Sequence, residues 1–232
     1  MKGLILLVYF NRPNLVHNAL ESIRQLKYLN YEVAAIDDGS DIPLKDIIEE
    51  HYYDIAPKFT HYQIKDSEAV KVSQGGSLQG KWLNIAMQNS DADFAVILCD
   101  DDALQPKYFK KAEEWLKSNP DEVYGYCHVV EFNPLTELPI PKACAPSGLN
   151  YTKALNGRCM LDASQVLWRL APVKRDGIAF PYPMTTALDA DFYQQMYLKY
   201  GPCKFMWVVG QWKGVFPGQL GKREHFFKGT EG

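Results

Sequence analysis

The chain has 232 residues, of which 47% are hydrophobic and 23% are charged, and its formal net charge is -3. This length suits one sizeable hydrophobic core and is short for two independent domains, so we expect a single domain over residues 1–232. The small negative charge argues against a nucleic-acid partner, which would favour a basic surface. No apolar run approaches the ~20 residues that cross a bilayer and no signal peptide is visible, which favours a cytoplasmic protein without a transmembrane segment.

The cysteines favour a reducing compartment. Their number is odd, their spacings are wide and no C-x-x-C pair occurs, which argues against both a zinc site and a disulfide framework. Free thiols are therefore expected at Cys99, Cys127, Cys144, Cys159 and Cys203.

Strand and helix patterns alternate through the first half of the chain. Residues 4–10 and 31–36 are continuous apolar runs, as expected for strands buried on both faces, and residues 94–98 form the clearest strand. This alternation predicts an α/β fold with a parallel, doubly wound sheet. Apolar residues at helical spacing predict helices over residues 15–26, 43–50, 78–89 and 106–118, and a weaker strand is expected over residues 59–64.

The second half of the chain is less regular. Residues 123–132 form a predicted strand and residues 133–150 a predicted loop, while residues 164–169 suit either a strand or a helix. Residues 190–200 have a helical pattern. Glycine recurs from Gly210 onward, which predicts a mobile loop to the end of the chain.

Two acidic clusters come directly after predicted strands. Asp37 and Asp38 follow the second strand, and Asp100, Asp101 and Asp102 follow the clearest one. In doubly wound sheets, ligands bind at the carboxyl ends of the strands. The position of both clusters at such ends is the strongest functional signal in the pattern alone.

The three adjacent carboxylates at residues 100–102 repel one another, and a bound cation would relieve that repulsion. Clustered oxygen ligands suit Mg²⁺ or Mn²⁺, which commonly bridge protein carboxylates to substrate phosphates. The alternative is a solvated loop with a helix-capping aspartate. The buried strand before the triplet favours the metal site.

Three other polar segments have both a functional and a structural interpretation. Residues 37–40 (DDGS) could bind a ribose or a base, or form a turn. Residues 189–191 (DAD) could supply a general base, or cap the helix that follows. Residues 222–225 (KREH) could close over a diphosphate and bind a metal, or form a solvated tail.

The motifs of several other enzyme classes are missing from the sequence. No G-x-G-x-x-G follows the first strand, which disfavours a nicotinamide dehydrogenase. Neither G-x-x-x-x-G-K-[ST] nor G-x-S-x-G occurs, which disfavours P-loop enzymes and serine α/β-hydrolases.

Four segments together resemble the family 2 glycosyltransferases of GT-A fold. Residues 8–12 (VYFNR) are similar to the end of the family's first strand, and residues 33–41 (VAAIDDGSD) to its V-V-D-D-G-S-x-D motif. Residues 94–106 (FAVILCDDDALQP) are similar to the segment with its D-x-D motif, and residues 187–192 (ALDADF) to its E-D-x-D segment. Order and spacing agree over residues 4–200. The implied fold is a Rossmann-like α/β fold with a mostly parallel central sheet flanked by helices.

The resemblance also implies roles for individual residues. Asp189 would be the catalytic base, and Asp101 or Asp102 would bind Mn²⁺ or Mg²⁺. The remaining implied contacts are Phe10, Arg12, Asp37, Asp38, Lys81 and Asp100 for the nucleotide, Arg223 for the diphosphate, His225 for the metal, and Asn84, Asp191 and Trp212 for the donor or the acceptor. Arg223 and His225 lie in a tail segment similar to that of a spore-coat glycosyltransferase of the family.

Three departures from the family pattern concern contacts to the sugar donor. Cys99 stands where many members have the first Asp of the metal motif, and Leu188 replaces the Glu before the base. The usual A-R-N helix is not reproduced, and Lys81 occupies the place where its Arg is expected.

The implied reaction is the transfer of a sugar, with inversion, from a nucleotide diphosphate to a hydroxyl acceptor such as a saccharide, in polysaccharide biosynthesis. UDP is the favoured carrier. Residues 1–105 would bind the nucleotide, and residues 106–232, with a flexible tail, the acceptor. Two alternatives stay open: a sugar-1-phosphate nucleotidyltransferase, although the loop after the first strand lacks glycine, and a non-catalytic module that binds a nucleotide sugar or a carbohydrate.

Overall fold

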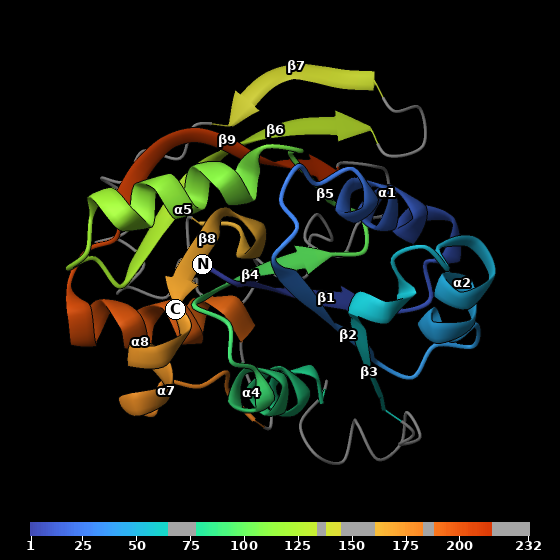
Figure 1. Cartoon of the computed structure of the whole chain (residues 1–232), viewed down its shortest axis with the longest axis horizontal. Helices are drawn as coiled ribbons and strands as arrows, with labels where there is room; N and C mark the ends of the chain where they lie inside the picture. The colour runs from blue at the N-terminus through green and yellow to red at the C-terminus, as the bar shows by residue number, and fades with distance from the viewer. Residues whose placement is uncertain (65–77, 134–137, 145–160, 183–187, 215–232) are drawn as a thin grey trace, which may run out of the picture.

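The computed structural model describes residues 1–64, 78–133, 138–144, 161–182 and 188–214 (Figure 1). Within these residues nine strands join one sheet in the order β3-β2-β1-β4-β8-β6-β9-β5, and β7 pairs with β6. The strands are β1 Gly3–Tyr9, β2 Tyr31–Asp37, β3 Phe59–Gln63, β4 Phe94–Cys99, β5 Ala103–Leu104, β6 Tyr124–Asn133, β7 Leu138–Cys144, β8 Val166–Arg169 and β9 Lys204–Gly214.

Strands β3, β2, β1 and β4 form the parallel half of the sheet, with β1 between β2 and β4. Successive residues of β1 point to opposite faces. Ile5 and Leu7 join the core on one face, and Leu4 and Leu6 join the core on the other. Because both faces are covered, the strand needs the continuous apolar run that the sequence shows.

Helices cover both faces of the sheet (Figure 1). Helices α1, α2 and α5 pack on the face of Ile5 and Leu7, and helices α4, α7 and α8 pack on the opposite face. None of the helices in the described residues combines the length and apolar character needed to cross a membrane. The helices are α1 Pro13–Arg24, α2 Leu44–His51, α4 Gln79–Asn89, α5 Tyr108–Ser118, α7 Leu170–Arg175 and α8 Leu188–Tyr200, with the 3-10 turns η1 Ala56–Lys58 and η3 Ala163–Gln165.

The second half of the sheet is mixed and differs most from the sequence prediction. The predicted loop over residues 133–150 is wrong for residues 138–144, because β7 pairs antiparallel with β6. Gly210 also lies inside a strand, β9, instead of a loop. A Cβ at Gly210 would lie 2.4 Å from Cys127 Sγ and 2.6 Å from Tyr108 Cε2. This glycine therefore permits a close approach between β9 and its neighbours. Composition alone does not distinguish a glycine with this role from a glycine in a loop.

Candidate active site

Three parallel strands end at the same edge of the sheet. Tyr9 of β1 lies opposite Asp37 of β2, and Val8 of β1 lies opposite Cys99 of β4. The segments that follow these strands therefore emerge side by side, and both acidic clusters lie on them. This is the edge where ligands bind in doubly wound sheets.

Hydrogen bonds tie these three segments to one another. The N–H of Phe10 donates to Asp100 Oδ2 at 3.0 Å, and the N–H of Asn11 donates to Ser40 Oγ at 3.0 Å. Asn11 Oδ1 in turn accepts from the N–H of Asp41 at 2.8 Å. Asn11 has a φ of 49°, in the left-handed region that few residues other than glycine adopt without cost. The loop after β1 is thus held in a defined conformation between its two neighbours.

Arg12 partly neutralises the acidic triplet. Its Nη1 atom lies 2.9 Å from Asp100 Oδ1 and 3.2 Å from Asp101 Oδ2. Burial raises the pKa of Asp100 to about 6, and the charge of Arg12 opposes that rise. Arg12 therefore keeps two buried acidic side chains next to the loop that carries Phe10.

A lysine links the third carboxylate to the second half of the chain. Asp102 is fully buried, and Lys213 Nζ of β9 lies 3.4 Å from its Oδ2 atom and 3.1 Å from Asp162 Oδ2. Burial raises the pKa of Asp102 to about 8. Burial also opposes the charge of Lys213, but Asp102 and Asp162 outweigh it and raise the pKa of Lys213 well above its ordinary value.

Asp162 is fixed in place by the turn that it begins. It caps η3: its Oδ1 atom accepts from the N–H of Ser164 at 3.1 Å, and the Gln165 side chain accepts from the N–H of Asp162 at 2.8 Å. Burial works against the charge of Asp162, yet Lys213 and Ser164 lower its pKa below the usual range. Asp162 is therefore a rigid, ionised carboxylate.

Asp189 lies near Asp162, in the first turn of α8. Burial, followed by the negative charge of Asp162, raises the pKa of Asp189 above its ordinary value. The two carboxylates thus have opposite shifts, and Asp189 is the better proton acceptor of the two once ionised. Asp191 lies in the same helical turn and is half-buried.

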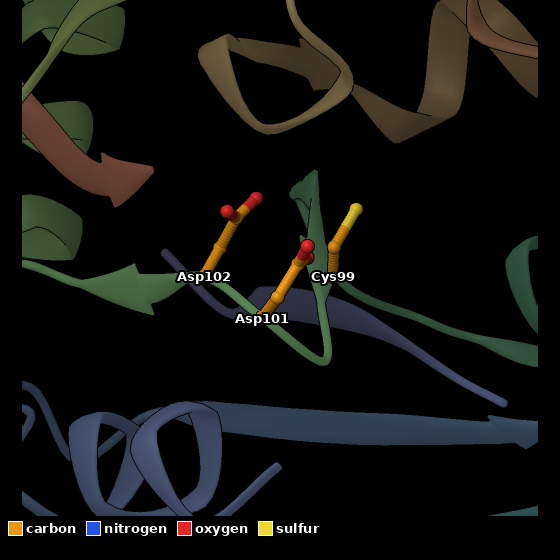
Figure 2. Close-up of side chains that lie close together, drawn as sticks. All are labelled: Cys99, Asp101 and Asp102. Carbon is orange, nitrogen blue, oxygen red and sulfur yellow. The ribbon is translucent and has the colours of Figure 1, made fainter. Parts of the chain in front are cut away.

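A compact set of metal-ligand types follows β4. The ligand atoms of Cys99, Asp101 and Asp102 all lie within 4.8 Å of one another, and Figure 2 shows the three side chains pointing to the same side of the turn. Burial, and then the charge of Asp102, raise the pKa of the Cys99 thiol well above its usual range. Two buried carboxylates and a thiol at this spacing fit one divalent cation, which would offset the cost of their burial.

The metal-free protein is expected to lose stability as the pH rises from about 4 to about 8. A carboxyl group with a raised pKa binds its proton more tightly in the folded chain than in the unfolded chain. The stabilising effect of that proton is lost above the unfolded value of 3.8, as the pH passes the folded values of about 6 for Asp100 and about 8 for Asp102. Thermal unfolding in the presence of a chelator measures this, and Asp102→Asn should flatten the profile. A midpoint that rises over the same interval in the unmodified chain would contradict the prediction.

The family model for glycosyl transferase family 2 matches residues 4–160, which include both acidic clusters, 37–38 and 100–102. The chain belongs to glycosyl transferase family 2. The match ends before Asp162, so the lysine link and Asp189 lie outside the matched residues. The family expected from the resemblance is confirmed.

Relatives of known structure confirm the GT-A fold. TarS 1–349 of S. aureus, in complex with UDP-GlcNAc, has a TM-score of 0.72 and 18% identity, over 94% of this chain and 60% of that one. The mannosyltransferase PcManGT of Pyrobaculum calidifontis, in complex with GDP-Man and Mn²⁺, has a TM-score of 0.64 and 14% identity, over 94% and 58%. Protein CgeD of Bacillus subtilis (strain 168) is 23% identical over 131 residues, which are 56% of this chain and 30% of CgeD. This family member thus spans less than two thirds of each of these proteins.

The side chain of Asp37 has a structural role in this family member, because both of its oxygens accept backbone hydrogen bonds. Its Oδ1 accepts from the N–H of Ser40 at 2.8 Å and its Oδ2 from the N–H of Leu44 at 2.9 Å. The neighbouring carboxylate of Asp38 accepts from Gln79 Nε2 at 3.2 Å. Asp37 thus uses both oxygens to hold the turn after β2 and the start of α2.

Replacing Asp37 with alanine is expected to lower the free energy of unfolding by about 2–4 kcal/mol, because two buried N–H groups lose their acceptor. Chemical denaturation of Asp37→Ala and of Asp38→Asn compares the two positions directly. Asp38→Asn should be nearly as stable as the unmodified chain, since an amide oxygen can still accept from Gln79. Equal losses in the two variants would contradict the assignment.

The other residues predicted to contact the nucleotide, the donor or the acceptor lie on two different elements of this glycosyl transferase family 2 chain, α4 and β9. Lys81 is exposed, with its Nζ atom 5.9 Å from the centre of the Tyr182 ring. Asn84 uses its amide to accept from the N–H of Phe180 at 2.8 Å and to donate to the carbonyl of Phe180 at 2.9 Å. Trp212, 39% exposed, precedes Lys213 on β9. Asn84 therefore positions a neighbouring segment, and its contact with a donor stays a prediction.

Two groups of this site have no counterpart in the sequence prediction. Asp162 lies three residues before Gln165, which is the spacing of a capping box and a local signal in the sequence. Lys213 lies in the segment from Gly210 onward that composition predicts to be a loop, and an isolated lysine in a strand gives no functional signal. The predicted tail contacts, Arg223 and His225, lie outside the described residues.

Proposed function

We propose that the chain transfers a sugar, with inversion of configuration, from a nucleoside diphosphate donor to a hydroxyl acceptor, with a divalent cation and with UDP as the carrier. The observation that carries this proposal is the meeting of carboxylates from both halves of the chain at one sheet edge, where Lys213 contacts both Asp102 and Asp162. Family membership supports sugar transfer over nucleotidyl transfer. The complexes of TarS with UDP-GlcNAc and of PcManGT with GDP-Man and Mn²⁺ support the donor class and the cation.

The nucleotide is proposed to bind to residues 1–105. Phe10 is 43% exposed although it is large and apolar, which suits a stacking surface for a flat base. Asp38 and Asp100 are the carboxylates proposed to accept from the base and the ribose, and Lys81 the cation proposed to approach the diphosphate. In this arrangement Asp37 supports the loop, and Arg12 forms ion pairs with Asp100 and Asp101.

Asp101 and Asp102 are the residues proposed to hold the divalent cation, with Cys99 beside them. A cation at this place supplies neutralisation of the charge that grows on the departing diphosphate. Arg12, from the loop after β1, contacts Asp101, and Lys213, from β9, contacts Asp102.

Asp189 is the proposed general base, which takes the proton of the acceptor hydroxyl as the new bond forms. Asp162 is the competing candidate, but its ion pair with Lys213 lowers its pKa and makes it the weaker base. One base suffices for an inverting transfer, because the leaving diphosphate does not need a proton. The acceptor is proposed to bind against residues 106–232, a half that contains Asp191 and Trp212. Arg223 and His225 remain proposed contacts for the diphosphate and the metal.

The proposed reaction is tested by incubating the chain with a panel of nucleotide sugars, Mn²⁺ and saccharide acceptors, and by identifying the nucleotide that is released. Release of a nucleoside diphosphate, with an inverted anomeric configuration in the product, is the expected result. Release of pyrophosphate would instead indicate nucleotidyl transfer. Binding of a donor without turnover across many acceptors would favour a non-catalytic module.

The sulfur of Cys99 gives the proposed metal site a spectroscopic signature. Co²⁺ bound by Asp101 and Asp102 is expected to draw the Cys99 thiolate into coordination and to produce a sulfur-to-metal charge-transfer band. The band should be absent in Cys99→Ser and unchanged in Cys203→Ser, a control at a half-buried thiol outside the Cys99, Asp101 and Asp102 cluster. Co²⁺ binding without this band in the unmodified chain would remove Cys99 from the ligand set and leave the carboxylate site intact.

A further inference from the structure

Trp207 on β9 is a large aromatic residue that the fold leaves almost bare. It is 83% exposed, whereas Trp168 on β8 is fully buried. A single exposed apolar residue is ordinary in a folded protein, and exposure alone assigns it no role. The backbone at Trp207 supplies the second observation.

The backbone of Trp207 has a φ of 55°, in the left-handed region. A residue with a Cβ adopts this region at a cost in free energy, and a bulky side chain is an outlier there. Asn11 is the other described residue besides glycine with a positive φ, and asparagine tolerates the region well. Glycine would fit the backbone at position 207 without strain. Local strain of this kind occurs mainly where a side chain serves a function.

A β-bulge surrounds Trp207. Between the paired positions Phe205 and Val209, β9 has three residues where β6 has one. Bulges re-aim side chains and are common at sheet edges. In the described part of the chain residues 204–209 lie at such an edge, because β5 pairs only with Gln211 and Trp212 (Figure 1). Charged residues or proline usually protect an edge, and an exposed tryptophan does not.

Other aromatic rings support the ring of Trp207. Its centre lies 4.7 Å from the centre of the Phe205 ring. The Phe205 ring in turn lies 4.3 Å from the ring of His128 and 5.1 Å from that of Tyr126, which is buried in the core. The series of rings therefore runs from the core to the surface. A ring supported in this way loses little conformational freedom when a ligand binds to it.

A saccharide is the ligand that suits this ring. One face of a pyranose ring carries C–H groups that pack against an aromatic ring, while the hydroxyl groups stay in contact with water. A protein partner would need roughly 800 Å² of surface. On β9 the other exposed large apolar residues are Val209 and Trp212, which make a narrow strip. The membership of the chain in glycosyl transferase family 2 also favours a sugar.

We propose that Trp207 stacks on one sugar unit of an extended saccharide acceptor, at a subsite separate from the place of sugar transfer. This inference rests on the proposed function, because it assigns the bound saccharide to the acceptor. Trp207 precedes Lys213 by six residues on β9, which is at most ~20 Å at the rise of a strand. An acceptor of several sugar units therefore contacts both places, and a monosaccharide contacts one.

The direct test is calorimetric titration of three hexasaccharides, cellohexaose, maltohexaose and chitohexaose, into the chain without a nucleotide donor. At least one of them should bind, and Trp207→Gly should weaken that binding on the order of tenfold. Trp207→Phe keeps an aromatic ring and should retain most of the affinity. Tyr53→Ala removes an exposed aromatic ring from another part of the surface and should leave the affinity unchanged.

Thermal unfolding shows that a loss of binding is not a loss of fold. Trp207→Gly should unfold at the same temperature as the unmodified chain or a higher one, because glycine relieves the positive φ and little buried surface is lost. Unchanged affinity in the folded variant would overturn the subsite, and so would failure of all three hexasaccharides to bind. A dimer of the unmodified chain that Trp207→Gly dissociates would overturn it too, because a second copy would then cover the ring.

Transfer kinetics separate this proposal from the proposed function. With a hexasaccharide acceptor, Trp207→Gly should raise KM on the order of tenfold and leave kcat unchanged, whereas KM for a monosaccharide acceptor should not change. Transfer with the same KM for long acceptors in both forms would overturn the subsite and leave the function intact. Binding that depends on Trp207, without transfer to any acceptor, would support the subsite and contradict the transferase function.

Discussion

Asp189→Asn is expected to lower the rate constant of sugar transfer by about 10²–10⁴-fold, the contribution of a positioned general base. The substitution keeps the size of the side chain and its place in the first turn of α8, so Mn²⁺-dependent UDP binding should be retained. Single-turnover kinetics with saturating donor measure the loss, and titration of UDP checks that binding is unchanged.

Asp162→Asn is the comparison that decides between the two candidate bases. It removes the negative charge that raises the pKa of Asp189, so the acidic limb of the kcat/KM profile should move to lower pH. In the unmodified chain that limb should lie above 3.8, because burial and Asp162 both raise the pKa of Asp189. A variant at Asp162 that abolishes transfer, together with an active Asp189→Asn, would reverse the assignment of the base.

The double substitution Asp101→Asn and Asp102→Asn is expected to weaken Mn²⁺-supported UDP binding by on the order of 10²-fold or more, since both proposed oxygen ligands lose their charge. Calorimetric titration of UDP in the presence of Mn²⁺ measures the loss. Asparagine at position 102 can still accept from the N–H of Gly214, so the contact with β9 is kept.

Thermal unfolding separates this loss of binding from a loss of fold. Burial raises the pKa of Asp102 to about 8, so an ionised carboxylate at this place destabilises the metal-free protein. The double variant should therefore unfold at a temperature equal to or above that of the unmodified chain in the presence of a chelator. Undiminished UDP affinity in a folded double variant would contradict the metal site.

The parallel half of the fold follows from the sequence because its strands are buried on both faces. Residues such as Ile5 and Leu6 contact cores on opposite sides of β1, and that requirement gives an uninterrupted apolar run. The same parallel arrangement places Asp37 and the 100–102 triplet at one edge, so the first half of the site could be predicted from position in the chain.

The second half of the site depends on contacts between segments far apart in the chain. β9 contains Gly210 and Gly214, which composition assigns to a loop, although each allows backbone to approach a neighbouring element. Lys213 belongs to the site because it contacts Asp102 and Asp162, which lie 111 and 51 residues earlier in the chain. No local sequence pattern predicts contacts over such separations. Asp162 alone had a local signal, its capping turn.

The most direct test of the account is calorimetric titration of UDP into the unmodified chain, once with Mn²⁺ and once with excess chelator. The central claim is that the acidic sheet edge binds a nucleotide only together with a divalent cation. Saturable UDP binding is expected with Mn²⁺, and a loss of affinity of about tenfold or more is expected in chelator. Equal affinities in the two titrations would contradict it.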